Sequence, residues 1–148
     1  SQHSIMSSNA NSNIPLVDLR ANYHGIKAEI DAAMAAVLDK TAFIQGPFVG
    51  AFEKNFARYI GTSECVGVDN GTNALVMALH AAGVRRGDEV ITQANTFNAT
   101  VAAIVHVGAV PVLVDCLDDG TYMMDVDAVR RALAAHPRVR AVMPVHLY

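Results

Sequence analysis

The chain has 148 residues, of which 52% are hydrophobic and 17% are charged, and its formal net charge is −3 at pH 7. An apolar half with few charges excludes a disordered chain, and this length suffices for one domain with a buried core. The 11 Lys and Arg residues are outnumbered by 14 Asp and Glu residues, and the arginines are scattered singly or in pairs, so we expect no nucleic-acid partner.

The first 13 residues are rich in Ser and Asn and lack the basic flank and apolar core of a signal peptide. We expect a disordered tail or an expression remnant over residues 1–13 and a fold over residues 14–148. The longest apolar stretch, residues 99–114, contains Gly108 and Pro111 and is shorter than the ~20 residues that a bilayer requires, so it predicts no membrane span. The spacing of Cys65 and Cys116 predicts neither a zinc site nor a disulfide, which favours a cytoplasmic protein.

Two helices are predicted first along the chain. Apolar residues recur every three or four positions over residues 24–40, the pattern of an amphipathic helix. A second helix is predicted from about Pro47 to Tyr59, because proline suits a first helical turn and Gly61 suits the position after the last one.

The rest of the chain alternates between strand and helix patterns. Strands are predicted at residues 65–68, 89–92, 110–114 and 139–145, and helices at residues 71–82, 96–107 and 125–135. Runs such as VPVLV are apolar at successive positions, which is typical of parallel strands covered on both faces. The predicted fold class is therefore α/β, with N-terminal helices followed by a mainly parallel sheet. Since no helix follows the last predicted strand, we also expect a truncated chain.

The first strand-to-helix junction has the sequence VDNGTNAL, residues 68–75. Ligands of open parallel sheets bind beyond the carboxyl ends of the strands. Unpaired N–H groups of Gly71, Thr72 and Asn73 at a helix N-terminus would suit an anion, above all a phosphate. The alternative is an ordinary turn in which Asn70 caps the helix. The lone glycine excludes a nucleotide P-loop and does not support a dinucleotide fingerprint.

The other two junctions give weaker signals. Phe97 at the second junction could stack on a planar heterocycle, or it could pack beneath its helix as a hydrophobic staple. At the third junction Asp115, Asp118 and Asp119 indicate a solvated turn, and we expect no metal there. His146 ends the last predicted strand on the ligand edge, where a structural role is favoured over a catalytic one.

Six blocks of sequence follow one another in the order of a known family. The blocks are IPLVDL, GPFVGAFEKNFARYIG, VDNGTNAL, GDEVITQANTFNAT, GAVPVLVD and PVHLY, at residues 14–19, 46–61, 68–75, 87–100, 108–115 and 144–148. In this order they resemble the DegT/DnrJ/StrS family of sugar aminotransferases, and the resemblance covers residues 14–148. These enzymes belong to the aspartate-aminotransferase-like, fold-type-I group that uses pyridoxal phosphate.

The resemblance implies a cofactor, partners and site residues. The cofactor is pyridoxal 5'-phosphate, which becomes pyridoxamine 5'-phosphate in the half-reaction. Gly71, Thr72 and Asn73 would bind its phosphate and Phe97 would stack on its pyridine ring. Residues Phe43, Gln45 and Gly46 would lie near a nucleotide-sugar site at a dimer interface. The resemblance further implies a homodimer with shared active sites and an amino donor, typically glutamate.

The resemblance also implies that the chemical centre is missing from this chain. Transamination needs a lysine that forms a Schiff base with the cofactor. The three lysines, Lys27, Lys40 and Lys54, lie on the two early helices, so the catalytic lysine is expected beyond Tyr148. We therefore predict the N-terminal part of a longer aminotransferase, inactive on its own. A dehydratase with histidine in place of that lysine, and a non-catalytic binding or regulatory module, remain alternatives; the sugar, the aminated carbon and the nucleotide carrier stay open.

Overall fold

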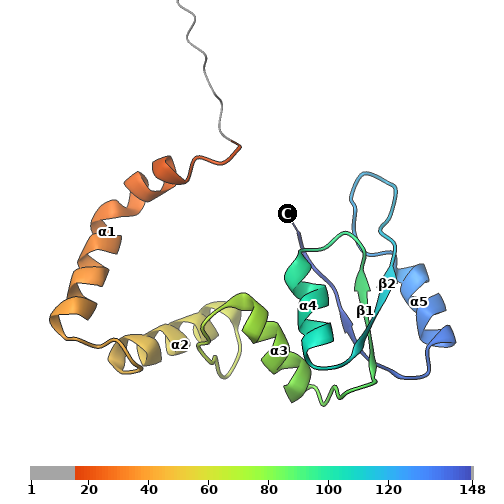
Figure 1. Cartoon of the computed structure of the whole chain (residues 1–148). Coiled ribbons are helices and arrows are strands. Elements are labelled where there is room, and N and C mark those ends of the chain that lie inside the picture. Colours follow the sequence, from red (N-terminus) through yellow and green to blue (C-terminus); the bar gives the residue numbers. More distant parts are fainter. Residues whose placement is uncertain (1–15, 148) are drawn as a thin grey trace, which may run out of the picture. The chain divides into compact units, whose positions relative to one another are not determined.

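The computed structural model describes residues 16–147 (Figure 1). The tail predicted for residues 1–13 lies outside the described residues, as does Tyr148. The chain divides into two compact units, residues 1–65 and residues 66–148, and each is described by itself.

The first unit contains the two predicted helices. Helix α1 (Leu19–Asp39) begins five residues earlier than predicted, because the Asp18 carboxylate accepts a hydrogen bond from the Ala21 N–H at 2.9 Å and caps the helix there. Helix α2 (Pro47–Ile60) has proline in its first turn and ends at Gly61, whose φ of 84° is the left-handed conformation that glycine adopts without strain. The second helix therefore ends as its sequence predicts.

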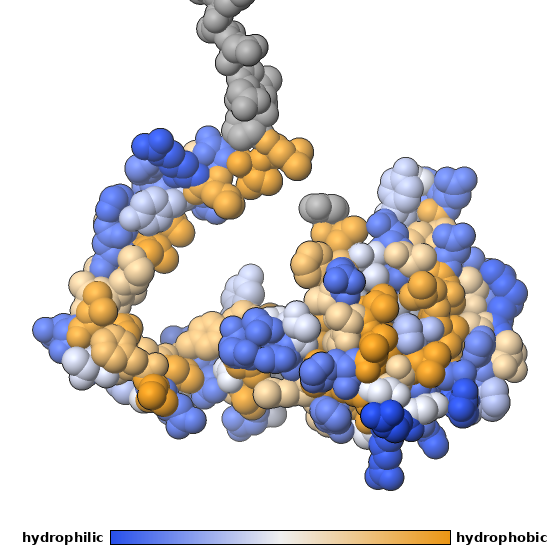
Figure 2. Space-filling view, viewed as in Figure 1, coloured by the Kyte–Doolittle hydropathy of each residue, from blue (hydrophilic) through white to orange (hydrophobic). Residues whose placement is uncertain are grey.

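Helix α1 carries an exposed apolar stripe. None of its residues is buried, and Ile26, Met34 and Leu38 are 45%, 53% and 62% exposed. Figure 2 shows apolar side chains in orange along this helix. An amphipathic helix gains stability by covering such a stripe, so this surface is suited to contact with another apolar surface.

The second unit is an α/β fold built on three parallel strands in the order β2-β1-β3. Ile91 of the central strand faces Val112 on one side and Val142 on the other. The fold class predicted from the sequence is confirmed. The elements, in chain order, are α3 (Gly71–Ala81), β1 (Glu89–Gln93), α4 (Asn98–His106), β2 (Val110–Val114), α5 (Val126–Ala135) and β3 (Val139–Met143).

Helices cover both faces of this sheet. Helix α4 lies on one face and α5 on the other, with α3 packed against α4 (Figure 1). All five residues of β1 are buried in consequence. The core is formed by apolar side chains of α3, β1 and α4 and of the segments beside them: Leu79, Val84, Val90, Ala103, Ile104, Val107 and Ala109.

Two strand predictions need correction. Residues 65–68 join none of the three strands, and Val66 is 76% exposed. An apolar run specifies burial but not a partner, and a strand exists only where a neighbouring strand accepts and donates its backbone hydrogen bonds. The last strand, predicted to reach Val145, ends at Met143 because Pro144 has no N–H to continue the ladder.

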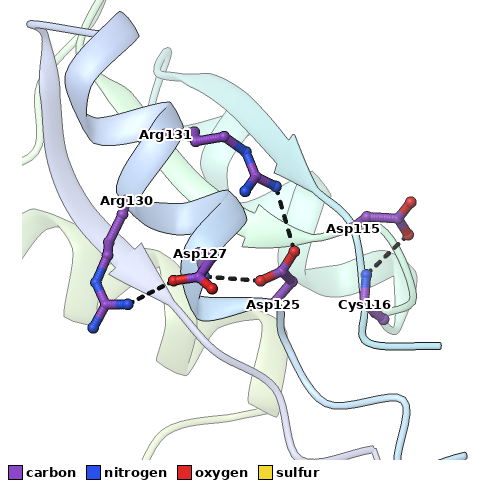
Figure 3. A network of polar contacts seen from close by, with 6 residues as sticks. All are labelled: Asp115, Cys116, Asp125, Asp127, Arg130 and Arg131. Carbon is purple, nitrogen blue, oxygen red and sulfur yellow. Dashed lines mark hydrogen bonds and ion pairs between the residues drawn. The ribbon is translucent and has the colours of Figure 1, made fainter. Parts of the chain in front are cut away.

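The carboxylates around the third junction take part in turns and caps (Figure 3). Asp125 caps α5 and accepts from the Asp127 N–H at 2.8 Å. Hydrogen bonds from the backbone N–H groups of Ala128 and Asp127 hold the pKa of Asp125 below its usual value despite partial burial. Asp115 accepts from the Cys116 N–H at 2.9 Å.

Two further properties concern residues 16–147 as a whole. Among them, no three His, Cys, Asp or Glu side chains are grouped so that they could hold a metal ion. In the same range, no helix combines the length and the apolar character that crossing a membrane requires.

Candidate cofactor site

A cavity of about 560 Å³ lies in the second unit, at the carboxyl edge of the sheet. Its walls come from the start of α3 with Gly71 and Thr72, from Phe97 just before α4, and from residues 143–146 at the end of β3 and beyond it. Parallel strands bring the segments that follow them to one edge, which is why residues distant in sequence meet here. Three residues singled out from the sequence, Gly71, Thr72 and Phe97, therefore line one cavity.

The N-terminus of α3 combines a cap with free donors. The Asn73 N–H donates to Oδ1 of Asn70 at 2.9 Å, and the Ala74 N–H donates to the Asn70 carbonyl at 3.1 Å. The expectation that the Asn73 N–H is unpaired is wrong, because Asn70 caps the helix as the alternative held. Within the described residues, the N–H groups of Gly71 and Thr72 have no protein acceptor. Both residues line the cavity, so the two remaining donors are available to an anion there.

Gly71 leaves space at this helix start. A Cβ atom built on it would meet nothing within 4 Å, and its φ lies outside the region that favours glycine. Neither packing nor backbone conformation therefore requires glycine at this position. The backbone at Gly71 is therefore open to the close approach of a ligand.

Phe97 presents its ring at the wall of the cavity. The side chain is 68% exposed, so the alternative in which it packs beneath its helix is wrong. Its backbone is held from the first turn of α4, since the Thr100 N–H donates to the Phe97 carbonyl at 3.0 Å. The hydroxyl of Thr96 bonds that of Thr100 at 2.9 Å, and Thr100 is 3% exposed. An open ring on a fixed backbone is suited to stacking on a planar group.

Two residues at this edge differ from what their sequence positions suggested. His146 lines the cavity from three residues beyond the end of β3, instead of ending the strand. Gln93, which the sequence analysis did not single out, is 2% exposed and bonds the backbone of Val145 through its side chain. The available signal was a glutamine that directly follows the strand predicted at residues 89–92.

Residues Phe43, Gln45 and Gly46 belong to the first unit and form the loop between α1 and α2. Gln45 and Gly46 both have positive φ, 52° and 106°, and Phe43 is 65% exposed. A non-glycine residue in this conformation is uncommon and stores strain. The role of these three residues at a nucleotide-sugar site stays a prediction.

The lysines of the chain all belong to the first unit. Lys27 pairs with Asp31 one turn later on α1, which, together with a bond to Tyr23, raises its pKa. Lys40 follows α1 directly and Lys54 lies on α2.

The cavity fits a cofactor that carries a phosphate on a flat ring. Free N–H groups at the positive end of a helix dipole bind phosphate, and a threonine hydroxyl adds a donor beside them. The aromatic wall gives the ring a stacking surface, and the open space at Gly71 admits the phosphate close to the backbone. Pyridoxal phosphate has this chemistry. The described unit is therefore an α/β fold with a cavity suited to such a cofactor.

The chain belongs to the DegT/DnrJ/EryC1/StrS aminotransferase family, whose family model matches residues 24–148. One relative is the dTDP-3-amino-3,4,6-trideoxy-alpha-D-glucose transaminase of Micromonospora megalomicea subsp. nigra. It is 48% identical over 126 residues, which are 85% of this chain and 33% of that protein. The chain thus spans about a third of the length of the curated relatives that it matches.

Solved structures show the same relation. S. venezuelae DesV matches with a TM-score of 0.85 and 42% identity over 91% of this chain and 36% of that one. NtdA of Bacillus subtilis, solved with bound cofactor PMP, matches with a TM-score of 0.75 and 34% identity over 82% and 27% of the two chains. Both cover the described fold and leave most of the larger neighbour unmatched.

Proposed function

We propose that residues 14–148 are the N-terminal part of the cofactor-binding domain of an aminotransferase. The enzyme would use pyridoxal phosphate to transfer an amino group from glutamate to a keto-sugar linked to a nucleotide. The single observation that carries the proposal is the cavity that joins the free donors of α3 to the ring of Phe97. The transaminase named above, which acts on a dTDP-linked sugar, supports the substrate class.

Bound pyridoxal phosphate supplies an electron sink that stabilises negative charge on the substrate carbon. This chain's own residues bind and orient. The N–H groups of Gly71 and Thr72, with the Thr72 hydroxyl, hold the phosphate. Asn73 contributes indirectly, because its N–H donates to the Asn70 side chain that caps the helix. Phe97 would stack on the ring of the cofactor.

The proton-transferring lysine is proposed to lie beyond Tyr148. The chain spans about a third of the length of its curated relatives, and that lysine is proposed to belong to the remaining part of the protein. A separate polypeptide of residues 1–148 would then be inactive. Both cysteines are unpaired, which supports the proposal of a reducing, cytoplasmic compartment.

We also propose a homodimer with shared active sites. The apolar stripe of α1, including Ile26, Met34 and Leu38, supports this, because two such stripes would cover one another. Phe43, Gln45 and Gly46 are proposed to contact the nucleotide-sugar. They lie in the loop between α1 and α2, where Gln45 holds a strained positive φ.

The test uses the full-length protein. Pyridoxal phosphate is titrated into the apoprotein. Binding is followed by the absorbance of the cofactor, and the titration gives the dissociation constant. Glutamate is then added to look for conversion to pyridoxamine phosphate. Binding followed by conversion supports the aminotransferase. Binding without conversion favours the dehydratase, and no binding favours a non-catalytic module.

A further inference from the structure

The side chain of Gln93 joins the ends of two strands at the carboxyl edge of the sheet. Its Nε2 donates to the Val145 carbonyl at 3.0 Å, and its Oε1 accepts from the Val145 N–H at 3.1 Å. The same Nε2 donates to the Asn95 carbonyl at 3.2 Å. Both amide protons and one lone pair are thus used within a residue that is 2% exposed.

These bonds begin where the backbone ladder stops. The last register pair of β1 and β3 is Thr92 opposite Met143, and the Thr92 hydroxyl donates to the Met143 carbonyl at 2.8 Å. One residue further, Pro144 has no N–H to donate, so the ladder cannot continue through the backbone. An amide side chain carries the same donor and acceptor pair as a peptide group. Gln93 therefore uses its side chain to join β1 to Val145, two residues beyond the last register pair of β3.

The segment held in this way forms one wall of the cavity. Residues 143–146 line it together with Phe97 and the start of α3, whereas Gln93 does not. Without Gln93, the bonds that fix residues beyond Met143 to the central strand are lost, and nothing in regular secondary structure replaces them. A mobile wall leaves the cavity less preorganised for a ligand. Ordering the wall on binding then costs part of the binding free energy.

We infer that Gln93 is a positioning residue for the cofactor cavity: it acts through Val145, fixing the Pro144–His146 wall in the shape that binds pyridoxal phosphate. The inference rests on the proposed function, because it takes this cavity as the cofactor site. It predicts an effect on binding from a side chain that does not touch the cofactor.

A purely structural role would give a different result. Buried polar groups stabilise a fold wherever they are fully hydrogen-bonded, and such a role would move stability alone. Glu89, at the other end of the same strand, provides the matched control. It is 8% exposed and bonds His136 and Arg138, far along β1 from the cavity walls. Glu89→Gln should lower stability without changing the cavity.

The experiment compares Gln93→Met and Glu89→Gln with the wild type in the full-length protein. Methionine keeps the length of glutamine and removes all three hydrogen bonds. Three quantities are measured: the dissociation constant for pyridoxal phosphate, the melting temperature of the apoprotein, and amide hydrogen exchange over residues 143–147. Gln93→Met is expected to weaken binding about tenfold, the equivalent of about 1.4 kcal/mol, and to speed exchange at Val145. Glu89→Gln is expected to lower the melting temperature and leave the dissociation constant within about twofold.

The outcomes separate the inference from the proposed function. If the wild type does not bind pyridoxal phosphate, the proposed function is wrong and the inference is wrong with it. If the wild type binds, and Gln93→Met binds equally well or leaves exchange at Val145 unchanged, the inference alone is overturned. The inference is also overturned if Glu89→Gln lowers the melting temperature as much as Gln93→Met does and weakens cofactor binding by the same factor. Should Gln93→Met fail to fold, Gln93→Asn replaces it, since that shorter amide stays polar but cannot span to Val145.

Discussion

The two ends of strand β1 both bury a polar side chain, and they do so in different ways. At the amino end, Oε1 of Glu89 meets His136 Nδ1 at 3.3 Å and Arg138 Nη2 at 3.4 Å. At the carboxyl end, neutral Gln93 bonds backbone groups alone. The charged cluster ties the segment before β3 to the central strand, whereas the neutral amide shapes a cavity wall without adding a charge.

The amino end also carries an incompletely satisfied charge. Oε2 of Glu89 is buried and has no hydrogen-bond partner within the described residues. Burial by itself would raise the pKa of Glu89, but the hydrogen bond from His136 and the charge of Arg138 outweigh it and hold this pKa below its usual value. This end of the sheet is therefore expected to affect stability, and the other end ligand binding.

The largest expected effect comes from the ring at the carboxyl edge. Phe97→Ala in the full-length protein should weaken pyridoxal phosphate binding by tenfold or more, since aromatic stacking on a planar base is worth about 1–3 kcal/mol. Because Phe97 is 68% exposed, the melting temperature of the apoprotein should stay within about two degrees. Titration by cofactor absorbance measures the first quantity and calorimetry the second. An unchanged dissociation constant would show that the Phe97 ring does not contact the cofactor.

Next in size is the phosphate donor on α3. Thr72→Ala should weaken binding about tenfold, since a hydrogen bond to a charged group contributes about 1.5–3 kcal/mol. Thr72→Ser keeps the hydroxyl and should retain most of the affinity, which makes it the matched control. If alanine and serine behave alike, the hydroxyl is not a phosphate donor.

Substitution of the neighbouring glycine is expected to have smaller effects, which are opposite in sign for stability and for cofactor affinity. Gly71→Ala should raise the stability of the apoprotein by about 0.4–1 kcal/mol, because alanine restricts the unfolded chain and its Cβ meets no neighbour. The same methyl group should weaken cofactor binding several-fold by entering the space beside the phosphate donors. Denaturant unfolding and cofactor titration are run on the same sample. Tighter binding by the variant would contradict the reason given for this glycine.

The smallest expected effect on binding is at the amino end of β1. Since the folded pKa of Glu89 lies below that of the unfolded chain, its ionisation stabilises the fold fully above the unfolded value near 4.5. That contribution is lost as the pH falls from there through the lower folded value. Glu89→Gln should therefore flatten the fall in melting temperature on acidification below about pH 4.5 and leave cofactor affinity unchanged. If the melting temperature falls equally steeply with acidification in both proteins, Glu89 does not cause that fall.

Much of the fold follows from local sequence signals. Proline in a first turn and glycine after a last turn fix the ends of α2, and runs of successive apolar residues indicate the parallel strands. These signals fail where the pairing of one strand with another decides whether a segment becomes a strand. Residues 65–68 have the composition of a strand, but a strand is defined by its neighbour, and local sequence does not name one.

For the site, the sequence identified the chemistry of single positions. The helix N-terminus at Gly71 and Thr72 and the ring of Phe97 are local features that residue types reveal. Two questions at the same positions stayed open: whether Phe97 is buried, and whether the Asn73 N–H is free. The fold answers them, because exposure of the ring depends on how α4 meets the sheet and the Asn70 cap depends on the shape of the turn.

The sequence by itself determined the fold class, the family blocks and the residue types that suit a phosphate and a flat ring, since these depend on periodicity and on local backbone chemistry. Only the tertiary structure decided that Gly71, Thr72 and Phe97 share one cavity with residues 143–146, and that Gln93 bonds Val145 from fifty-two residues away. Contacts across such a separation come from the parallel register of β1 and β3. That register is set by packing on both faces of the sheet, and the ladder ends where Pro144 has no N–H to donate. The residue type at position 93 reveals neither.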